Sequence, residues 1–381
     1  MSSEAAIAVE RAEREPVLGC RFAPVRAAID AAAPLLDGDH AEPALRARLL
    51  LRLAEVQLVE SDWEGAEQAL EAAARHVPDD TALRVLAALR ECRVAIRRGP
   101  AERAVAQRTV LATVARFDQL ADASPTWREV TLEIALAIGE LAVHDDPPEP
   151  SAFEPLIALV AELAHDPRRF DFAFTARGLI AMAALSRGEL APAATALRAN
   201  AKLAQSVGSP ADEVEARLAL AGALVESGDP IALAEATRTV QIARDRALEH
   251  GLVELHHAAV LAQAGALSAA GKTAGAIDRV LELARTAAAS GDLQQYVAAV
   301  AVMAELYTRS GDHVSAFRTI VETHRALATA TRDDPTDLFR PLLARLRDKI
   351  GGAKLDKIAA DVDQANRLAD AIAAKKPNDS R

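Results

Sequence analysis

The sequence predicts an all-α protein built as a solenoid of stacked helix pairs, and three observations support this fold class. First, 51% of the 381 residues are hydrophobic but only 3% are aromatic, and alanine supplies much of the apolar share. Alanine is the best helix former and buries little area, so it suits thin layers of closely packed helices. Second, β-branched and aromatic residues occur without the alternating runs that are typical of strands. Third, turn signals recur at a fixed period in the second half of the chain.

The recurring turns are marked by two interleaved series of glycines. One series consists of Gly188-Glu189, Gly228-Asp229, Gly271-Lys272 and Gly311-Asp312, which are 40, 43 and 40 residues apart. The other consists of Gly208, Gly251 and Gly291. Two series at one period indicate two helices per repeat, each ending where glycine can adopt a positive φ. The stretches between the turns carry apolar residues at steps of three and four, as helices do.

The best-formed repeat covers residues 47–80 and carries a recognisable order of residue types. A large and a small residue, Leu53-Ala54, lie in its first helix, and the turn is Ser61-Asp62-Trp63. Its second helix then presents Ala66, Leu70 and Ala73, and Pro78 closes it. This order resembles the tetratricopeptide repeat (TPR) family, in which small side chains let helix axes cross closely. The resemblance extends over about residues 41–331, where matching small residues are Ala181, Ala221, Ala264 and Ala304 in first helices and Ala193, Ala236, Ala276 and Ala316 in second helices.

The resemblance implies a right-handed TPR-like α-solenoid of about seven helix pairs. We expect these pairs at residues 41–77, 80–120, 125–165, 168–207, 210–250, 252–290 and 292–331. A further helix is expected at 22–36, after a frayed or disordered N-terminus at residues 1–20. In domain terms, N-terminal repeats span 21–143, a proline-rich acidic loop spans 144–155, C-terminal repeats span 156–331, and C-terminal helices with a basic tail span 332–381.

Two segments leave alternatives open. Pro147, Pro148 and Pro150 forbid a regular helix in the loop, which is either a domain boundary or a long connection inside one repeat. In the last helix, apolar residues at alternating steps of three and four form a seam that serves either as a cap on the last repeat or as a dimerisation surface. The seam consists of Leu355, Ile358, Val362, Ala365, Ala369 and Ile372.

Candidate recognition residues follow from the resemblance, because TPR-like arrays line their concave surface with the first helices. The implied partner-binding positions are Glu55, Arg93, Met182, Leu185, Gly222, Val225, Gly265, Ser268, Glu305 and Arg309. A glycine inside a helix costs about 1 kcal/mol relative to alanine, so Gly222 and Gly265 indicate a close approach, either by a neighbouring helix or by a ligand. Phe170, Phe172 and Phe174 are either core residues or an exposed aromatic anchor for a partner.

Charge and motifs narrow the functional class. A net charge of −11 disfavours direct nucleic-acid binding. The start of the chain does not look like a signal peptide and no long apolar stretch occurs, so we expect a cytoplasmic protein without membrane insertion. The abundance of alanine and arginine is typical of a GC-rich bacterial genome. Residues 266–273 match a relaxed phosphate-loop pattern, but a helical pattern precedes them and Gly271 fits the repeat turn. We expect no catalytic residues, no cofactor and no metal.

The sequence therefore predicts a non-catalytic scaffold or adaptor that recognises another protein through an amphipathic helix or a peptide. The C-terminal helix could add homodimerisation to this function. The alternative is a regulatory sensor, because the chain also resembles, in size and build, helical-repeat regulators that sense peptides. Such a protein binds a peptide or small-molecule signal and passes it to a partner protein.

Overall fold

The computed structural model confirms the predicted all-α class. It describes residues 2–14, 22–36, 42–59, 62–77, 82–120, 125–145, 147–162, 170–331 and 335–374. These ranges contain eighteen α-helices and one 3-10 helix, with no strand among them. The chain divides into two compact units, unit 1 (Met1–Ser227) and unit 2 (Gly228–Arg381), and each unit is described by itself below.

Unit 1 holds the first eleven α-helices and the 3-10 helix η1. They are α1 (Ser2–Arg14), α2 (Phe22–Leu36), α3 (Pro43–Val59), α4 (Trp63–Ala74), α5 (Ala82–Arg98), α6 (Pro100–Leu120), α7 (Pro125–Ala142), the 3-10 helix η1 (Pro150–Phe153), α8 (Glu154–Glu162), α9 (Phe170–Ser186), α10 (Leu190–Val207) and α11 (Pro210–Glu226). Unit 2 holds α12 (Pro230–Glu249), α13 (Val253–Ala269), α14 (Thr273–Ser290), α15 (Leu293–Arg309), α16 (His313–Thr331), α17 (Thr336–Ile350) and α18 (Gly352–Ala374). All seven expected helix spans contain two helices.

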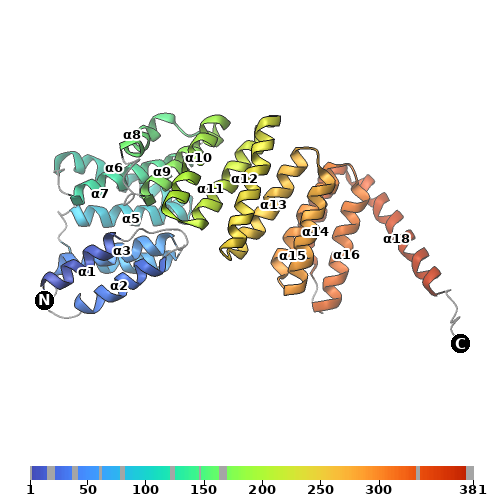
Figure 1. Ribbon diagram of the computed structural model, residues 1–381, viewed down its shortest axis with the longest axis horizontal. Coiled ribbons are helices and arrows are strands. Elements are labelled where there is room, and N and C mark those ends of the chain that lie inside the picture. Colours follow the sequence, from blue (N-terminus) through green and yellow to red (C-terminus); the bar gives the residue numbers. More distant parts are fainter. Residues whose placement is uncertain are drawn as a thin grey trace. The chain divides into compact units, whose positions relative to one another are not determined.

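Helices that follow one another in the chain pack side by side within each unit (Figure 1). In unit 1, α3 packs on α4, α5 packs on α6, and α10 lies against both α9 and α11. First helices also contact the next first helix, as α3 does α5 and α5 does α7. The predicted small residues are buried where helices cross, with Ala54, Ala66 and Ala264 fully inaccessible. These close crossings are the physical basis of a helical-repeat array.

Glycine ends the helices where the periodic turn signals predict it. A positive φ of 66° to 83° occurs at Gly188, Gly208, Gly251, Gly271, Gly291 and Gly311. Gly271, at φ 75°, lies between α13 and α14, and its backbone N–H donates to the carbonyl of Ser268. Residues 266–273 are thus the end of one helix and the start of the next, which confirms their interpretation as a repeat turn.

The expectation of a disordered N-terminus is wrong for residues 2–14, which form α1. Ala5, Val9 and Ala12 follow one another at steps of four and three, and all three are buried against α2 and α3. This apolar stripe is short, but burying it stabilises the helix, since tertiary packing supplies most helical stability in proteins. Residues 15–21 lie outside the described residues.

The proline-rich segment is a connection inside unit 1. It joins α7 to α8, and both helices pack against each other and against η1. Phe153 and Leu156 anchor the end of the segment in a core that also contains Leu132 and Leu136 of α7. The division between the compact units falls instead after Ser227, between the two helices of the fifth expected pair.

The C-terminal helix α18 packs against α16 and α17 of its own chain. Leu355, Ile358 and Val362 of the seam are buried there, and Leu355 joins the core of unit 2. Ala365 is exposed, and the side chains of Ala369 and Ile372 lie outside the described residues. The first half of the seam therefore covers the last repeat as a cap would, and dimerisation stays a prediction.

Candidate functional site: a cavity lined by first helices

Unit 1 contains a cavity of about 470 Å³ whose walls come from one side of the repeat array. Its lining residues belong mainly to the first helices α3, α5, α7, α9 and α11, with one residue from α1. Leucines and phenylalanines alternate on the walls with charged side chains. Ligand pockets in proteins span roughly 300–1,000 Å³ and combine apolar walls with a few placed polar groups, so the cavity has the size and chemistry of a binding site.

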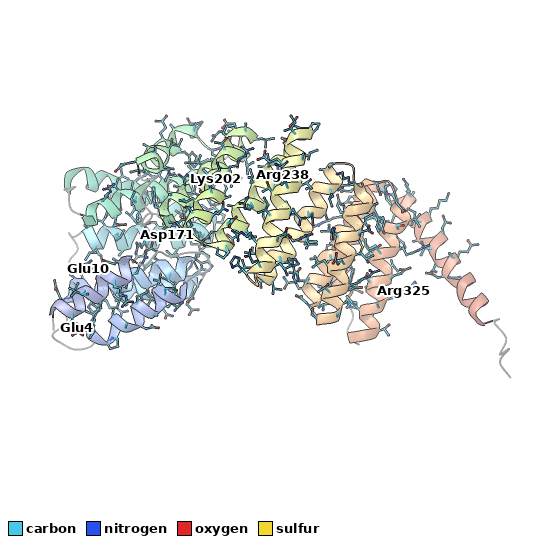
Figure 2. The ribbon with its side chains drawn as sticks, viewed as in Figure 1. Glu4, Glu10, Asp171, Lys202, Arg238 and Arg325 are labelled. Atoms are coloured by element: carbon cyan, nitrogen blue, oxygen red, sulfur yellow. The ribbon has the colours of Figure 1, made fainter. Side chains whose placement is uncertain are left out.

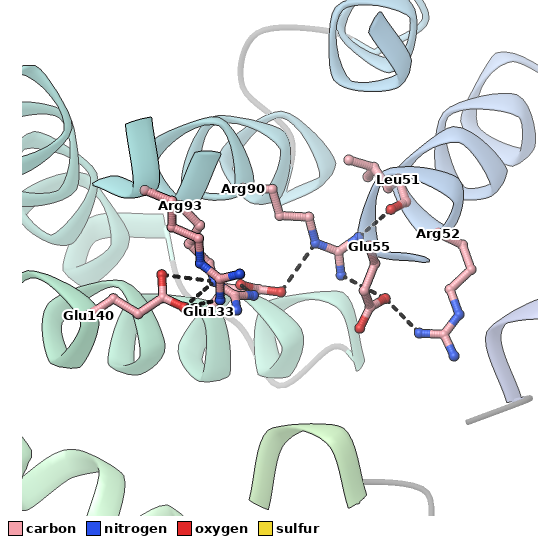
Figure 3. A network of polar contacts seen from close by, with 8 residues as sticks. Leu51, Arg52, Glu55, Arg90, Arg93, Glu133 and Glu140 are labelled. Carbon is pink, nitrogen blue, oxygen red and sulfur yellow. Dashed lines mark hydrogen bonds and ion pairs between the residues drawn. The ribbon is translucent and has the colours of Figure 1, made fainter. Parts of the chain in front are cut away.

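One wall of the cavity carries most members of a chain of alternating arginine and glutamate side chains, which we call the ion ladder (Figure 3). It begins on α3, where Arg52 donates to Glu55 at 2.5 Å. It crosses to α5 and α7 through Arg90, whose Nε lies 3.2 Å from Oε1 of Glu133. The members of the ion ladder are Arg52, Glu55, Arg90, Glu133, Arg93, Glu140 and Arg97.

The far end of the ion ladder is the most tightly connected. The guanidinium of Arg93 bridges two carboxylates of α7, lying 3.1 Å from Glu133 and 3.0 Å from Glu140. Glu140 also accepts from Arg97 at 3.2 Å, and the Arg97 guanidinium lies 5.3 Å from the centre of the Trp63 ring. Glu133 and Glu140 are seven residues apart, so they share one face of α7 and meet the arginines of α5 together.

Burial and neighbouring charges shift the pKa values of the carboxylates in the ion ladder in opposite directions. Burial by itself would raise the pKa of Glu55, but Arg52 and Arg90 outweigh it and lower the pKa to about 2. The pKa of Glu140 is likewise lowered, because Arg93 and Arg97 outweigh its burial. Both carboxylates are therefore ionised at neutral pH and hold the buried arginines in place. The ion ladder thus joins α3, α5 and α7 on the side where they face the cavity.

The opposite wall is formed by α9 and α11. Asp171 lies at the start of α9 (Figure 2), and Asp212 and Glu215 lie in the first two turns of α11. The described residues of these two helices contribute no lysine or arginine to the cavity lining. Among the described residues, the cavity lining therefore carries both arginines and carboxylates on the side of α1 to α7, and only carboxylates as charged groups on α9 and α11.

The structure places only some of the predicted partner-binding residues in this cavity. Glu55 and Arg93 line it and belong to the ion ladder. Met182, Leu185, Gly222 and Val225 lie further along α9 and α11, outside the lining. Of these, Met182 is 53% exposed, so this stretch of α9 presents an apolar side chain to the surface.

The predicted residues of unit 2 form a separate group on α13 and α15. Gly265 and Ser268 are half-buried on α13. On α15, Glu305 accepts from Nε of Arg309 at 2.9 Å and also pairs with Lys349 of α17. Glu305 therefore links two helices of its own unit.

Gly222 and Gly265 are not closely approached by a neighbouring helix. A Cβ atom added at Gly222 or Gly265 would meet no described atom within 4 Å. The interpretation as a close helix crossing is therefore wrong at both positions, and approach by a ligand stays a prediction. Gly139 on α7 behaves differently, because an added Cβ would lie 2.5 Å from Cδ1 of the fully buried Leu156.

We predict opposite effects of alanine at these two kinds of glycine. Gly222→Ala should stabilise unit 1 by roughly 0.5–1 kcal/mol, because it removes backbone freedom from the unfolded chain and meets open space. Gly139→Ala should destabilise it by roughly 1–3 kcal/mol through overpacking. Both tryptophans, Trp63 and Trp127, belong to unit 1, so urea unfolding followed by tryptophan fluorescence measures the effect. Equal effects of the two substitutions would contradict the packing described here.

None of the three phenylalanines of α9 is exposed. Phe170 and Phe172 are buried, and Phe170 stacks on the half-buried Phe174 with ring centres 5.4 Å apart. An exposed anchor is therefore wrong for Phe170 and Phe172. All three residues nevertheless line the cavity, so they form part of its apolar surface.

Most of the cavity's charged residues were not anticipated from the sequence. These are Glu13, Arg48, Arg52, Arg90, Arg97, Glu129, Glu133, Asp171, Asp212 and Glu215. A signal was present: Arg90, Arg93 and Arg97 recur at steps of three and four on α5, in register with its apolar face. Charges placed on an apolar face indicate buried pairing, because an unpaired buried charge is too costly. The partner of each charge, however, is 35 to 47 residues away in the chain.

Comparisons with known proteins concern the fold. No protein-family model and no curated protein matches the chain. Among solved structures, it is similar to a signal transduction ATPase with numerous domains (STAND) from Pyrococcus horikoshii that has a tetratricopeptide repeat sensor. The TM-score is 0.55 at 13% sequence identity, and the match covers 84% of this chain and 49% of that chain. This chain thus corresponds to about half of that protein's length.

None of the described helices is long and apolar enough to cross a membrane. The helices of each unit follow one another as packed pairs, the turns recur with the period of the sequence, and the structural match is to a repeat protein. The chain is therefore a helical-repeat protein with the TPR-like α-solenoid fold.

Proposed function

We propose that this protein is a non-catalytic recognition module of the sensor type, which binds a short peptide segment in the cavity of unit 1 and passes the signal to a partner protein. The cavity itself carries this proposal. It lies on the first helices, which line the binding surface of TPR-like arrays, and its volume of about 470 Å³ suits a few side chains rather than a long helix. The structural match to a protein with a TPR sensor is consistent with such a role.

The ion ladder supports a sensing role because it ties three first helices together beside the ligand site. A ligand that contacts the ladder changes the balance of contacts between α3, α5 and α7, and thus has a physical means of biasing their packing. Differential contact of this kind is what a ligand needs in order to shift a protein between conformations. A partner that recognises one of these packings would then receive the signal.

The broader scaffold function has its own supporting observation. Met182 is 53% exposed on α9, and Gly222 on α11 is exposed with open space above it, both outside the cavity. Exposed apolar and small residues on first helices suit the face of a partner helix. On this hypothesis Met182→Glu would abolish partner binding, whereas cavity variants would leave it intact.

The sensor proposal is tested by selecting ligands from a displayed library of random heptapeptides with the purified full-length chain. Thr175 is half-buried and lines the cavity, so Thr175→Trp places a bulky ring in it and obstructs a ligand. The matched control is Thr195→Trp on α10, where the threonine is exposed. We expect enriched peptides whose affinity falls at least about tenfold in Thr175→Trp and is unchanged in Thr195→Trp, since blocking a pocket removes most of its contacts. Failure to enrich any peptide, or enrichment of peptides indifferent to Thr175→Trp, would refute the proposal.

A further inference from the structure

The first helix of unit 1 docks through small side chains. Ala5, Val9 and Ala12 of α1 are buried against α2 and α3. Ile7, the largest apolar side chain of α1, is instead 67% exposed. Burying an alanine removes little apolar area from water, so the apolar contact of α1 is weak. The neighbouring α3, by comparison, buries four leucines.

Two arginines of α3 bind the last turn of α1. Nε of Arg48 donates to Oε1 of Glu13 at 2.8 Å, and its Nη2 pairs with the same carboxylate. Nε of Arg52 donates at 3.2 Å to the backbone carbonyl of Ala12, in a buried position. The last carbonyls of a helix have no partner within it and carry partial negative charge, so cations are stabilising there. The two arginines therefore supply the polar part of the attachment of α1.

Arg52 belongs to the ion ladder at the same time (Figure 3). While its Nε binds α1, its Nη1 donates to Glu55 at 2.5 Å, and Glu55 also pairs with Arg90. A guanidinium is planar and rigid, so a rotation that changes the bond to Glu55 also changes the bond to Ala12. The last turn of α1 is therefore attached to one end of the ion ladder.

The same end of α1 is part of the cavity. Glu13 lines the cavity together with Arg48 and Arg52. If the last turn of α1 leaves α3, Glu13 leaves the lining and Arg48 loses the carboxylate that it binds. Undocking of α1 therefore changes both the shape and the charge of the cavity beside α3.

We propose that α1 is a latch on the cavity, which opens without unfolding the rest of unit 1 and is held closed by Arg48 and Arg52. An isolated helix of this length is marginal in water, and segments with few buried apolar contacts open at a lower free energy than the core. A change in the ion ladder at Glu55 loosens the bond between Arg52 and Ala12 and so favours the open latch. This device goes beyond the proposed function, because it exists whether or not a peptide binds.

Hydrogen–deuterium exchange of the full-length chain, followed by mass spectrometry, tests the latch under conditions in which exchange reports the opening equilibrium. We expect the amides of residues 6–13 to be at least about tenfold less protected than those of residues 48–56 in α3. Arg48→Ala should lower the protection of α1 about threefold further, because a partly exposed ion pair is lost. The protection of α5 should not change.

The matched control for Arg48→Ala is Arg98→Ala. Arg98 of α5 also binds one glutamate through two nitrogens, Glu67 of α4. The two side chains are 40% and 44% exposed in this pair and 33% and 34% exposed in the pair of Arg48 with Glu13. Arg98→Ala therefore removes a similar ion pair elsewhere in unit 1 and should leave the protection of α1 unchanged.

Glu55→Gln tests the coupling of the latch to the ion ladder. It removes the carboxylate that Arg52 binds and should lower the protection of α1 at least about threefold. The amides of α10, which belongs to unit 1 but contributes no residue to the ion ladder, are the internal reference. Their protection should fall less than that of α1.

Each part of the inference has a result that overturns it. If α1 is as well protected as α3 in the wild type, or if Arg48→Ala and Arg98→Ala act alike on α1, the latch held by Arg48 is overturned. If Glu55→Gln lowers the protection of α1 no more than that of α10, the ion ladder does not control the latch. None of these results bears on peptide selection with Thr175→Trp, so the proposed function is tested separately.

Discussion

Replacing Glu140 by alanine is expected to destabilise unit 1 by about 3–5 kcal/mol, the range typical for removing one partner of a buried ion pair. Glu140 accepts from Arg93 at 3.0 Å and from Arg97 at 3.2 Å, and its side chain is 6% exposed. Its loss leaves Arg93 buried with Glu133 alone, and the desolvated positive charge is then only partly compensated. Urea unfolding followed by tryptophan fluorescence measures the change, because both tryptophans lie in unit 1.

The control for this prediction is Glu162→Ala on α8. Glu162 also pairs with an arginine, Arg128 of α7, but both side chains are more than half exposed. Exposed ion pairs contribute little, so this variant should unfold close to the wild type. A Glu140→Ala protein that unfolds as the Glu162→Ala protein does would show that the ion ladder does not hold unit 1 together.

The pH dependence gives a second check on the same residue. Because the pKa of Glu140 is lowered in the folded protein, its stabilising contribution is present above the ordinary glutamate pKa and is lost as the pH falls through the folded value. Glu55, with a pKa of about 2, behaves in the same way. The stability difference between wild type and Glu140→Ala should therefore be largest near neutral pH and narrow below about pH 4.

Phe339→Ala is expected to destabilise unit 2 by about 3–5 kcal/mol, the usual cost of emptying a large buried aromatic site. Phe339 on α17 is 1% exposed and belongs to the core formed by α13 to α18. Its ring also meets His324 of α16 edge-on, with ring centres 5.8 Å apart. The substitution thus loosens the contact of α17 with α16, on which α18 also packs.

The preceding residue supplies the control. Leu338 is 46% exposed on the same helix, so Leu338→Ala should change stability by less than about 0.5 kcal/mol. Urea unfolding followed by circular dichroism, which reports on both units, compares the two variants. A Leu338→Ala effect as large as that of Phe339→Ala would mean that the burial of α17 differs from that described here.

The helices and turns could be predicted because their causes are local. Gly208 and Gly291 end helices with a positive φ of 72° and 74°, a conformation that depends on the glycine and its immediate neighbours. Pro210 and Pro230 occupy first helical positions, where a missing N–H costs nothing. The apolar stripe of α1 is also a local feature of the sequence. A helix this short is marginal by itself, however, and only its packing on α2 and α3 makes it stable.

The candidate site could be predicted only in part. The positions of Glu55 and Arg93 on the side of the first helices that lines the cavity could be predicted, because repeat register is a property of the sequence. Their roles could not, since Arg93 meets Glu140 across 47 residues of chain and Glu55 meets Arg90 across 35. The alternatives at Gly222 stayed open for the same reason: whether a neighbour approaches a glycine depends on how the helices are spaced, and no described atom lies within 4 Å of a Cβ added there.

The sequence by itself determined that this protein is a helical-repeat array with a period of about 40 residues, because helix propensity, apolar spacing and glycine turns act within a few residues of one another. Only the tertiary structure decided where the candidate site forms. Packing brings α3, α5 and α7 together so that four arginines and three glutamates pair with one another as the ion ladder, and it brings acids of α9 and α11 to the lining of the same cavity. Electrostatic pairing depends on distance in space, and distance in space is set by packing rather than by order in the chain.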